Sequence, residues 1–238
     1  MNLTISKNYK SPNYSLRKSL NIIDTIILHY TGMDSAKSAL SHLCNEKSRV
    51  STHYFINEKG KLWQLVEDDK VAWHAGVSKW LDRKNLNETS IGIELVNPGH
   101  EHGYKEFTFE QYEILEKLIK YLINKYDIKI DRILGHSDIA PSRKLDPGEK
   151  FNWQRLAKKN LSIWPENILN LPVAEDPDEL LYNSLLNIGY DVKSYYEDSI
   201  FAFKRRFTPN NLLINNRNDL LKMVYSVYKE FSKIRSSY

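Results

Sequence analysis

Two histidines in the sequence stand where a metal site could form. His29 follows the apolar, β-branched run 22–28, and His136 follows a second apolar run, 130–135. Each run is typical of a buried strand, and side chains at the ends of adjacent strands can converge on one point. The chain contains one cysteine, Cys44, so a metal site here would have to use histidine and carboxylate ligands. Two histidines and one carboxylate, with a fourth position left to water, form a known catalytic zinc arrangement.

The segment that follows His136 offers the carboxylate. Residues 135–148 read GHSDIAPSRKLDPG, and the two prolines and two glycines set the path of the backbone. Lys144 and Asp146 are two residues apart, so in an extended chain both side chains would point the same way. Asp146 would then be the third metal ligand, with the Lys144 ammonium beside it.

A second catalytic interpretation uses the same histidine. Ser137 and Asp138 follow His136 directly and could suggest a serine hydrolase. Side chains of sequence neighbours rarely point at one another, and the sequence lacks the Gly-x-Ser-x-Gly motif that presents such a serine. The metal site is therefore the favoured interpretation.

The elements that would position these residues alternate between strands and helices. Apolar runs predict the strands, a turn at 58–60 predicts a hairpin, and capping residues predict the helix starts. The predicted strands are 22–29, 53–57, 61–66, 90–96 and 130–135, and the predicted helices begin at the caps Asp34 and Thr108, with a short helix at 152–159. This order predicts an α/β domain with a mixed central sheet flanked by helices.

The last part of the chain has a different pattern. Three prolines interrupt an acidic stretch at 164–178, which is typical of a linker. Three helices are expected beyond it: one from the N-cap Asp176 to about Gly189, one from Ser194 with Glu197 completing a capping box, and one over 218–234. We therefore expect a catalytic domain at 1–170 and a small three-helix domain at 171–238.

Five motifs occur in order along the first two-thirds of the chain. They are 27–31 (ILHYT), 51–56 (STHYFI), 72–76 (AWHAG), 91–94 (IGIE) and the block 136–148. Together they resemble the type 2 N-acetylmuramoyl-L-alanine amidases, a family related to peptidoglycan recognition proteins. The resemblance implies zinc-dependent hydrolysis of the amide bond between the lactyl group of N-acetylmuramic acid and L-alanine in bacterial peptidoglycan or muropeptides. It also implies one zinc ion (Zn2+) per chain held by His29, His136 and Asp146, with Glu94 as the catalytic carboxylate and Lys144 stabilising negative charge.

The role of Glu94 also has a physical basis. In the strand 90–96, Ile91, Ile93 and Leu95 share one face, so Glu94 lies on the other. Its carboxylate could take a proton from a zinc-activated water and deliver it to the leaving nitrogen. The intermediate of amide hydrolysis carries an oxyanion, which zinc and Lys144 would stabilise together.

Three further residues are candidate substrate contacts. His74 lies in the motif 72–76, which in the resembled family lines the substrate cleft, with structural packing as the alternative. His53, in the second motif, and Asn97, three residues after Glu94, are the other candidates. The remaining histidines, His42, His100 and His102, have no supporting pattern and are expected to be solvated.

The tail resembles the helical peptidoglycan-binding module that follows some members of this family. Segments 185–190 and 200–207 carry the likeness. Aromatic residues of the tail could line a glycan groove, with core packing as the alternative: Phe201, Phe203, Phe207, Tyr225 and Tyr228. The module could instead brace the catalytic domain without binding glycan.

Composition and net charge limit the classes of partner that the protein could bind. The net charge of +4 is too small for a nucleic-acid binder, and no run approaches the roughly 20 apolar residues of a membrane span. We therefore expect peptidoglycan or muropeptide fragments as partners, no nucleic acid, no transmembrane segment and a monomeric chain.

A wall-binding tail favours the periplasm or cell envelope, whereas the absence of a recognisable signal peptide in 1–20 favours the cytoplasm. A non-catalytic peptidoglycan-binding protein is the alternative function, and the complete set of ligands with Glu94 and Lys144 argues against it.

Overall fold

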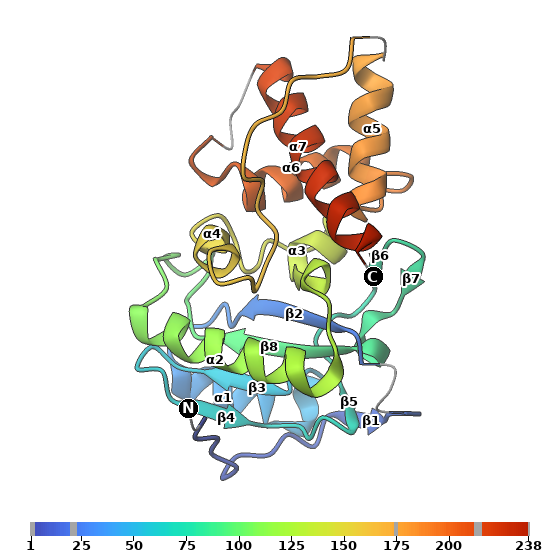
Figure 1. The fold of residues 1–238 in the computed structure, drawn as a ribbon. Coiled ribbons are helices and arrows are strands. Elements are labelled where there is room, and N and C mark those ends of the chain that lie inside the picture. Colours follow the sequence, from blue (N-terminus) through green and yellow to red (C-terminus); the bar gives the residue numbers. More distant parts are fainter. Residues whose placement is uncertain (1–2, 20–22, 174–175, 212–215, 238) are drawn as a thin grey trace.

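Parallel strands with one antiparallel edge strand form the main sheet of the protein (Figure 1). The computed structural model describes residues 3–19, 23–173, 176–211 and 216–237, and within these the strand order is β4-β3-β8-β2-β9. The strands are β2 (Thr25–Tyr30), β3 (Tyr54–Ile56), β4 (Leu62–Gln64), β8 (Ser90–Leu95) and β9 (Ile133–Gly135). Strands β3, β8, β2 and β9 run parallel, and β4 pairs antiparallel with β3.

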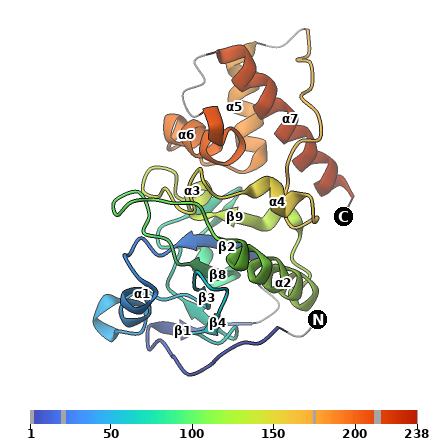
Figure 2. The ribbon, with the colours of Figure 1, turned by 90° about the vertical axis from the view of Figure 1, so that its left-hand side faces the viewer.

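The strands β2 and β8 are largely buried because helices lie on both sides of the sheet. All of β2 except Tyr30, and all of β8 except Glu94, is buried. Helix α2 (Phe109–Tyr126) lies on one side of the sheet and helix α1 (Ala36–Leu43) on the other (Figure 2). The apolar stripe of α2 packs against alternate residues of β2 and β8, while α1 packs near Phe55 of β3. His29 and Glu94 therefore lie on the face of these strands that is turned away from α2.

Shorter elements frame this sheet. Strand β1 (Tyr14–Leu16) pairs antiparallel with β5 (Lys70–Ala72), and β6 (Lys79–Trp80) pairs antiparallel with β7 (Arg83–Lys84). Helix α3 (His136–Ile139) follows β9 directly, and α4 (Trp153–Ala157) contributes buried residues to the cluster under α2. The 3-10 turns are η2 (Glu46–Ser48), η3 (Leu86–Thr89), η4 (Ile130–Arg132) and η5 (Pro209–Asn211).

The tail forms a helical module that packs on the α3 side of the sheet (Figures 1 and 2). It consists of α5 (Pro177–Ile188), α6 (Tyr196–Phe207) and α7 (Arg217–Ser236). Its buried residues, Leu185 and Phe203 among them, form one cluster with Trp80, Leu134 and Ile139 of the α/β part. This shared core joins the two parts, and a domain boundary at residue 170 stays a prediction. Within the described ranges, no helix combines the length and the apolar content that crossing a membrane requires.

The predicted fold class, a mixed sheet flanked by helices and followed by tail helices, is confirmed. The hairpin at 57–61, the capping box of Thr108 with Gln111, and the helix that begins at Asp176 and ends at Gly189 are all present. The first predicted strand, 22–29, is shifted to Thr25–Tyr30, and Ile22 lies outside the described residues. In the tail, Phe203 and Phe207 are core residues, whereas Phe201 is 52% exposed and its contact with glycan stays a prediction.

Three predicted element ends are wrong. Helix α1 is capped by Ser35 rather than Asp34, because Ser35 and Ser38 form a reciprocal capping box. The predicted strand at 130–135 begins as a 3-10 turn, since pairing with β2 starts only at Ile133. Helix α6 begins after Tyr195 without a side-chain cap, because the backbone at 191–195 is still engaged in the preceding turn.

Candidate active site

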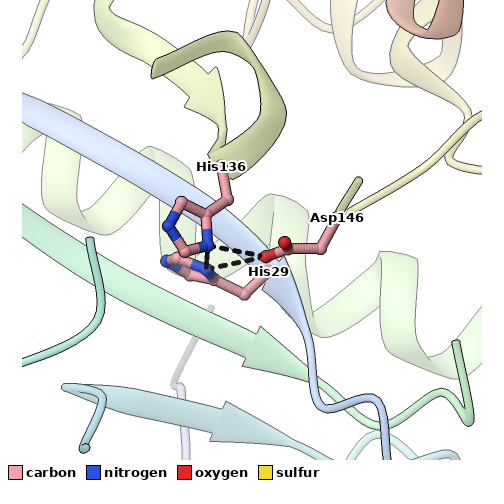
Figure 3. A group of neighbouring side chains, drawn as sticks. All are labelled: His29, His136 and Asp146. Carbon is pink, nitrogen blue, oxygen red and sulfur yellow. Dashed lines mark hydrogen bonds and ion pairs between the residues drawn. The ribbon is translucent and has the colours of Figure 1, made fainter. Parts of the chain in front are cut away.

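Three side chains from the two neighbouring strand ends and the following loop meet at one point (Figure 3). His29 Nδ1 lies 3.0 Å from His136 Nδ1, and Asp146 Oδ2 lies 2.9 Å from the first and 3.1 Å from the second. Because β2 and β9 are parallel neighbours, with Leu28 opposite Gly135, the residues that follow them emerge at the same edge. All three side chains are buried, so their polar atoms face one another rather than solvent.

The hydrogen bond on the far side of the His136 ring determines which nitrogen faces this point. His136 Nε2 lies 3.1 Å from the carbonyl oxygen of Ala75, which can only accept a hydrogen bond. The Nε2 atom must therefore carry a proton, and in the tautomer with that single proton the Nδ1 atom presents a lone pair to Asp146. A second partner of this kind fixes the tautomer of most metal-binding histidines.

The same reasoning applies to His29 through a longer chain of hydrogen bonds. The Ser90 hydroxyl donates to the Leu86 carbonyl oxygen at 2.5 Å, so it accepts from His74 Nε2 at 3.3 Å. His74 Nδ1 is then an acceptor for His29 Nε2, 3.0 Å away. Burial, with a further contribution from His136, lowers the pKa of His29 to about 4, so its ring is neutral near pH 7 and its Nδ1 is bare.

Three bare acceptor atoms facing one another at about 3 Å repel unless a cation lies between them. The carboxyl group of an aspartate is ordinarily ionised near pH 7, so the Oδ2 atom of Asp146 is an acceptor as well. Tetrahedral zinc with bonds of 2.0–2.1 Å would place its ligand atoms about 3.3 Å apart. The observed separations of 2.9–3.1 Å are close to this value, and the set could hold a metal ion.

Glu94 lies next to these ligands on the neighbouring strand. It pairs with His29 across β8 and β2, and its Oε2 atom is buried with no hydrogen-bond partner in the described part of the chain. Burial, and then the charge of Asp146, raises the pKa of Glu94 to about 8, while Lys144 acts in the opposite direction. A carboxyl group whose pKa lies near neutral pH can both accept and donate a proton during a reaction.

A cavity of about 400 Å³ opens over the ligands, a size suited to a small organic ligand. Glu94, Lys144 and Asp146 line it together, so the cationic and anionic groups share one space. Other residues around it are Tyr30, Met33, His42, Trp73, His100 and Arg143. The sheet edge, the loop 98–101 and the loop 143–146 thus form the walls of one polar site.

Comparisons with known proteins identify the family of this chain. The family described as N-acetylmuramoyl-L-alanine amidase matches residues 19–149. N-acetylmuramoyl-L-alanine amidase AmiD of Escherichia coli is 39% identical over 212 residues, which cover 79% of this chain and 75% of AmiD. The chain belongs to the N-acetylmuramoyl-L-alanine amidase family. The predicted family and its amidase activity are therefore confirmed.

Other relatives of the amidase agree with this assignment. The 1,6-anhydro-N-acetylmuramyl-L-alanine amidase AmpD of Haemophilus influenzae is 32% identical over 171 residues, covering 64% of this chain and 91% of AmpD. The solved structure of E. coli AmiD in complex with a substrate superposes with a TM-score of 0.73 at 33% identity, over 87% of this chain and 89% of that one. AmpDh3 of Pseudomonas aeruginosa superposes with a TM-score of 0.77 at 26% identity, over 97% of this chain and 100% of its own.

The serine-hydrolase interpretation is wrong for this amidase. Asp138 does not face His136, because its carboxylate accepts hydrogen bonds from Tyr190, Arg206 and the backbone of Gly135. The Nε2 atom of His136 is occupied by the Ala75 carbonyl oxygen, and its Nδ1 faces Asp146. No Ser-His-Asp relay can therefore form here.

The three candidate substrate residues occupy different positions in the amidase. His74 lines the cavity, although its two ring nitrogens are engaged by His29 and Ser90. His53 is fully buried and is held between the Gly92 amide and the Lys70 carbonyl oxygen. A substrate contact by His53 stays a prediction, and in this structure the residue braces β8 from outside the cavity.

Asn97 is likewise fully buried and does not line the cavity. Its amide donates to the Lys105 carbonyl oxygen at 2.7 Å, and its Oδ1 accepts from the Gly99 amide at 3.1 Å. The side chain thus holds the loop that forms one cavity wall. Direct contact with substrate stays a prediction for this residue as well.

Two of the cavity residues that the sequence does not single out have well-defined contacts. Arg143 is tied to the Ala75 and Val77 carbonyl oxygens at 3.0 and 2.6 Å. His100 is exposed, as expected, and its ring is also held by Tyr30 at 2.8 Å and Glu149 at 3.0 Å. The motif block 136–148 contains Arg143, which was a usable signal, whereas nothing near His100 in the sequence points to its partners.

Proposed function

We propose that this amidase uses one zinc ion, held by His29 Nδ1, His136 Nδ1 and Asp146 Oδ2, to hydrolyse the bond between the lactyl carboxyl of N-acetylmuramic acid and L-alanine in muropeptides. The observation that carries the proposal is the convergence of three bare acceptor atoms, 2.9–3.1 Å apart, at the base of the cavity. Both imidazoles have their protons directed away from this point, which suits cation binding. When bound, zinc supplies polarisation of the scissile carbonyl and activation of a water molecule.

The proton transfers fall to Glu94. Its carboxylate lies on the same face of the sheet as His29 and takes a proton from the attacking water as the C–O bond forms. The same group then delivers this proton to the amide nitrogen as the C–N bond breaks, so that the peptide leaves as a free amine. The unpartnered Oε2 atom is the acceptor that this step requires.

Lys144 stabilises the negative charge that develops on the carbonyl oxygen. It lines the same cavity as Glu94 and Asp146, and its backbone amide is fixed by the Ala140 carbonyl oxygen at 3.0 Å. A cation placed beforehand beside a developing oxyanion lowers the barrier, because it does not need to reorganise during the reaction. His74 contributes by holding the His29 ring in the orientation that the site needs.

We further propose that 1,6-anhydromuramoyl peptides are among the substrates. The AmiD structure contains anhydro-N-acetylmuramic acid-L-Ala-D-gamma-Glu-L-Lys, and an AmpDh3 structure contains an anhydromuramic pentapeptide. A cavity of about 400 Å³ can enclose part of such a molecule, the muramoyl group and the first residues of the stem peptide. Arg143 and Lys144 in its wall suit the carboxylates of that peptide.

A digestion experiment tests both parts. The purified chain is incubated with an anhydromuramoyl tripeptide or with intact sacculi, and free peptide is measured by mass spectrometry with native metal, after chelation, and after zinc is added back. We expect release to stop on chelation and to return with zinc in the native chain but not in His136→Ala. Full activity in a chain shown to be metal-free would contradict the zinc mechanism, and cleavage of sacculi alone would contradict the substrate class.

A further inference from the structure

Asp138 links the helical module to the metal site. Its Oδ2 atom accepts a hydrogen bond from the Gly135 amide at 2.8 Å and from Arg206 Nη1 at 2.6 Å, and its Oδ1 atom accepts from the Tyr190 hydroxyl at 2.8 Å. Arg206 lies on α6 and Tyr190 just after α5, so two of the three donors belong to the module. Figure 2 shows α6 directly beside α3, which begins with the ligand His136. The carboxylate is thus joined to both sides of the interface.

Arg206 also holds the strand that precedes the ligand. Its Nη2 atom donates to the Ile133 carbonyl oxygen and to the Ser162 hydroxyl, both at 3.2 Å. The guanidinium lies 4.0 Å from the centre of the Trp153 ring, a distance typical of a cation–π contact. One side chain therefore fixes the start of β9 through Ile133 and the helix turn through Asp138, and the ligand lies between these two contacts.

We propose that Arg206 and Tyr190 are positioning residues for the metal ligand His136, so that the helical module completes the active site. This inference rests on the proposed zinc site. The displacement of one ligand would also affect another, because the Ser137 amide donates to the Asp146 carbonyl oxygen at 2.9 Å. A loss of the contacts to Asp138 therefore loosens two of the three ligands at once.

Attachment of the module alone does not explain a buried ion pair at this place. Arg206 and Asp138 have side chains only 2% and 1% exposed, and removing two charges from water costs as much as their attraction returns. The apolar cluster around Trp80 and Phe203 already attaches the module. The ion pair instead fixes a direction in space. The planar guanidinium binds acceptors on both sides of His136, the Ile133 carbonyl oxygen and the Asp138 carboxylate.

Arg235 provides a matched control within the same molecule. It lies on α7 and joins the two parts through Asp131, 2.7 Å away, while its hydrogen bonds to the Asn187 and Ile188 carbonyl oxygens stay within the module. This pair also places a module arginine on a buried aspartate of the α/β part. Asp131 lies in η4, before β9, so within the described chain Arg235 supports attachment of the module without a hydrogen bond to residues 133–138.

The test measures zinc affinity on the full chain by competition with a coloured chelator. We expect Arg206→Met to weaken zinc binding about 10-fold or more, the range typical when a group supporting a metal ligand is removed. Tyr190→Phe should cause a smaller loss in the same direction, and Arg206→Lys should lie between wild type and Arg206→Met. Arg235→Met should lower the melting temperature yet keep the wild-type zinc affinity. In the cobalt-substituted protein, the d–d absorption should change for Arg206→Met and not for Arg235→Met.

Activity at saturating zinc gives a second readout, in which kcat should fall for Arg206→Met while KM stays near the wild-type value. Equal zinc affinities for the Arg206 and Arg235 variants would overturn the positioning role. If Arg206→Met does not fold, Tyr190→Phe and Arg206→Lys provide the test. Wild-type zinc affinity in both of these variants would overturn the positioning role. His136→Ala separates the two proposals: if it keeps zinc, the zinc site is wrong, and if it alone loses zinc, only the positioning role is wrong.

Discussion

His29 and His136 bring equivalent nitrogen atoms to the same point, but the chain supports them in different ways. His29 lies on β2, a six-residue strand that pairs with β8 on one side and β9 on the other. His136 follows the three-residue strand β9, and Asp146 lies in the loop beyond the short helix α3. Backbone pairing in the middle of a sheet holds the first ligand. Side chains from distant parts of the sequence hold the other two.

The difference separates the site into two halves. We call β2 and β8, with His29 and Glu94, the sheet half, and residues 133–148 the ligand loop. A catalytic metal site needs its ligands within about 0.5 Å of the productive geometry. In the sheet half this accuracy comes from strand register, whereas in the ligand loop it depends on contacts such as those of Asp138 with Arg206 and Tyr190.

Loss of a single metal ligand should lower activity more than any other change considered. The loss should be similar whether the ligand lies in the sheet half or in the ligand loop. We expect His29→Ala and Asp146→Ala each to lower kcat/KM about a thousandfold or more, because zinc supplies several kcal/mol of transition-state stabilisation. Zinc content, measured by atomic absorption, should fall with activity. Asp127→Ala, which removes an exposed carboxylate paired with Lys129, should leave both unchanged. An Asp146→Ala protein with full zinc and full rate would show that Asp146 is not a ligand.

Glu94→Gln should act on the sheet half without releasing the metal. The amide keeps the size of the side chain but cannot take up the proton from water, so we expect kcat to fall about 10²- to 10⁴-fold. Zinc content should stay at one per chain, and KM should change little. Loss of zinc together with activity would mean that Glu94 supports the metal rather than the proton transfer.

Two glycines, one in each half, give a more sensitive comparison. A Cβ atom on Gly92 would lie 2.5 Å from the His74 ring, and one on Gly135 would lie 2.8 Å from the Pro147 Cδ atom. Overpacking of this kind costs about 1–3 kcal/mol. We expect Gly92→Ala to be the more destabilising in urea unfolding of the metal-free chain, since His74 is held between His29 and Ser90 and cannot easily move.

The side chain that clashes with a Cβ atom at position 92 can be tested as well. Adding His74→Ala should restore part of the lost stability in Gly92→Ala and none of it in Gly135→Ala. If His74→Ala has the same effect in both backgrounds, the contact between Gly92 and His74 is not the cause of the loss.

The same two halves differ in how far the sequence could predict them. Strand β8 and the position of Glu94 on its inner face follow from alternation of apolar residues, and His29 follows from its place after an apolar run. The motif block indicated His136 and Asp146, but nothing local showed that Asp138 binds Arg206, which lies 68 residues further along the chain. Side-chain pairs at such separations depend on how the module packs, and hydrophobic patterns do not encode that.

Errors at element ends, and the contacts around the cavity that the sequence does not show, have a similar origin. Asp34 and Ser35 are both good caps, and the choice depended on the Ser38 side chain. His53 and Asn97 were singled out by motif and proximity, yet their hydrogen bonds go to backbone atoms of Gly92 and Lys105 that no sequence pattern identifies. His100 lies on the cavity because Tyr30 and Glu149 hold it there. Burial and hydrogen-bond partners depend on the tertiary structure, and the sequence pattern alone does not show them.

The smallest expected effect concerns acidification at Asp68, which lies outside both halves of the site. Asp68 is buried and accepts hydrogen bonds from Tyr126 at 2.6 Å, Tyr54 at 2.8 Å and Lys125 at 2.9 Å, so it ties the chain after β4 to the end of α2. Burial alone would raise the pKa of this carboxyl, but the three donors hold the pKa below its ordinary value of 3.8. The charged form thus stabilises the folded state at any pH above that ordinary value.

This contribution is lost as the pH falls below 3.8 toward the lowered pKa of the folded state. We therefore expect Asp68→Asn to be less stable than wild type near pH 7 and to lose less stability than wild type between pH 5 and 3, as measured by urea unfolding. Asp127→Asn is the control, because an exposed ion pair contributes little to stability. Parallel pH profiles for wild type and Asp68→Asn would show that Asp68 is not the group responsible. A flatter profile with unchanged zinc affinity near pH 7 would show that the contact between α2 and the chain after β4 can be weakened without disturbing His29, as strand register in the sheet half predicts.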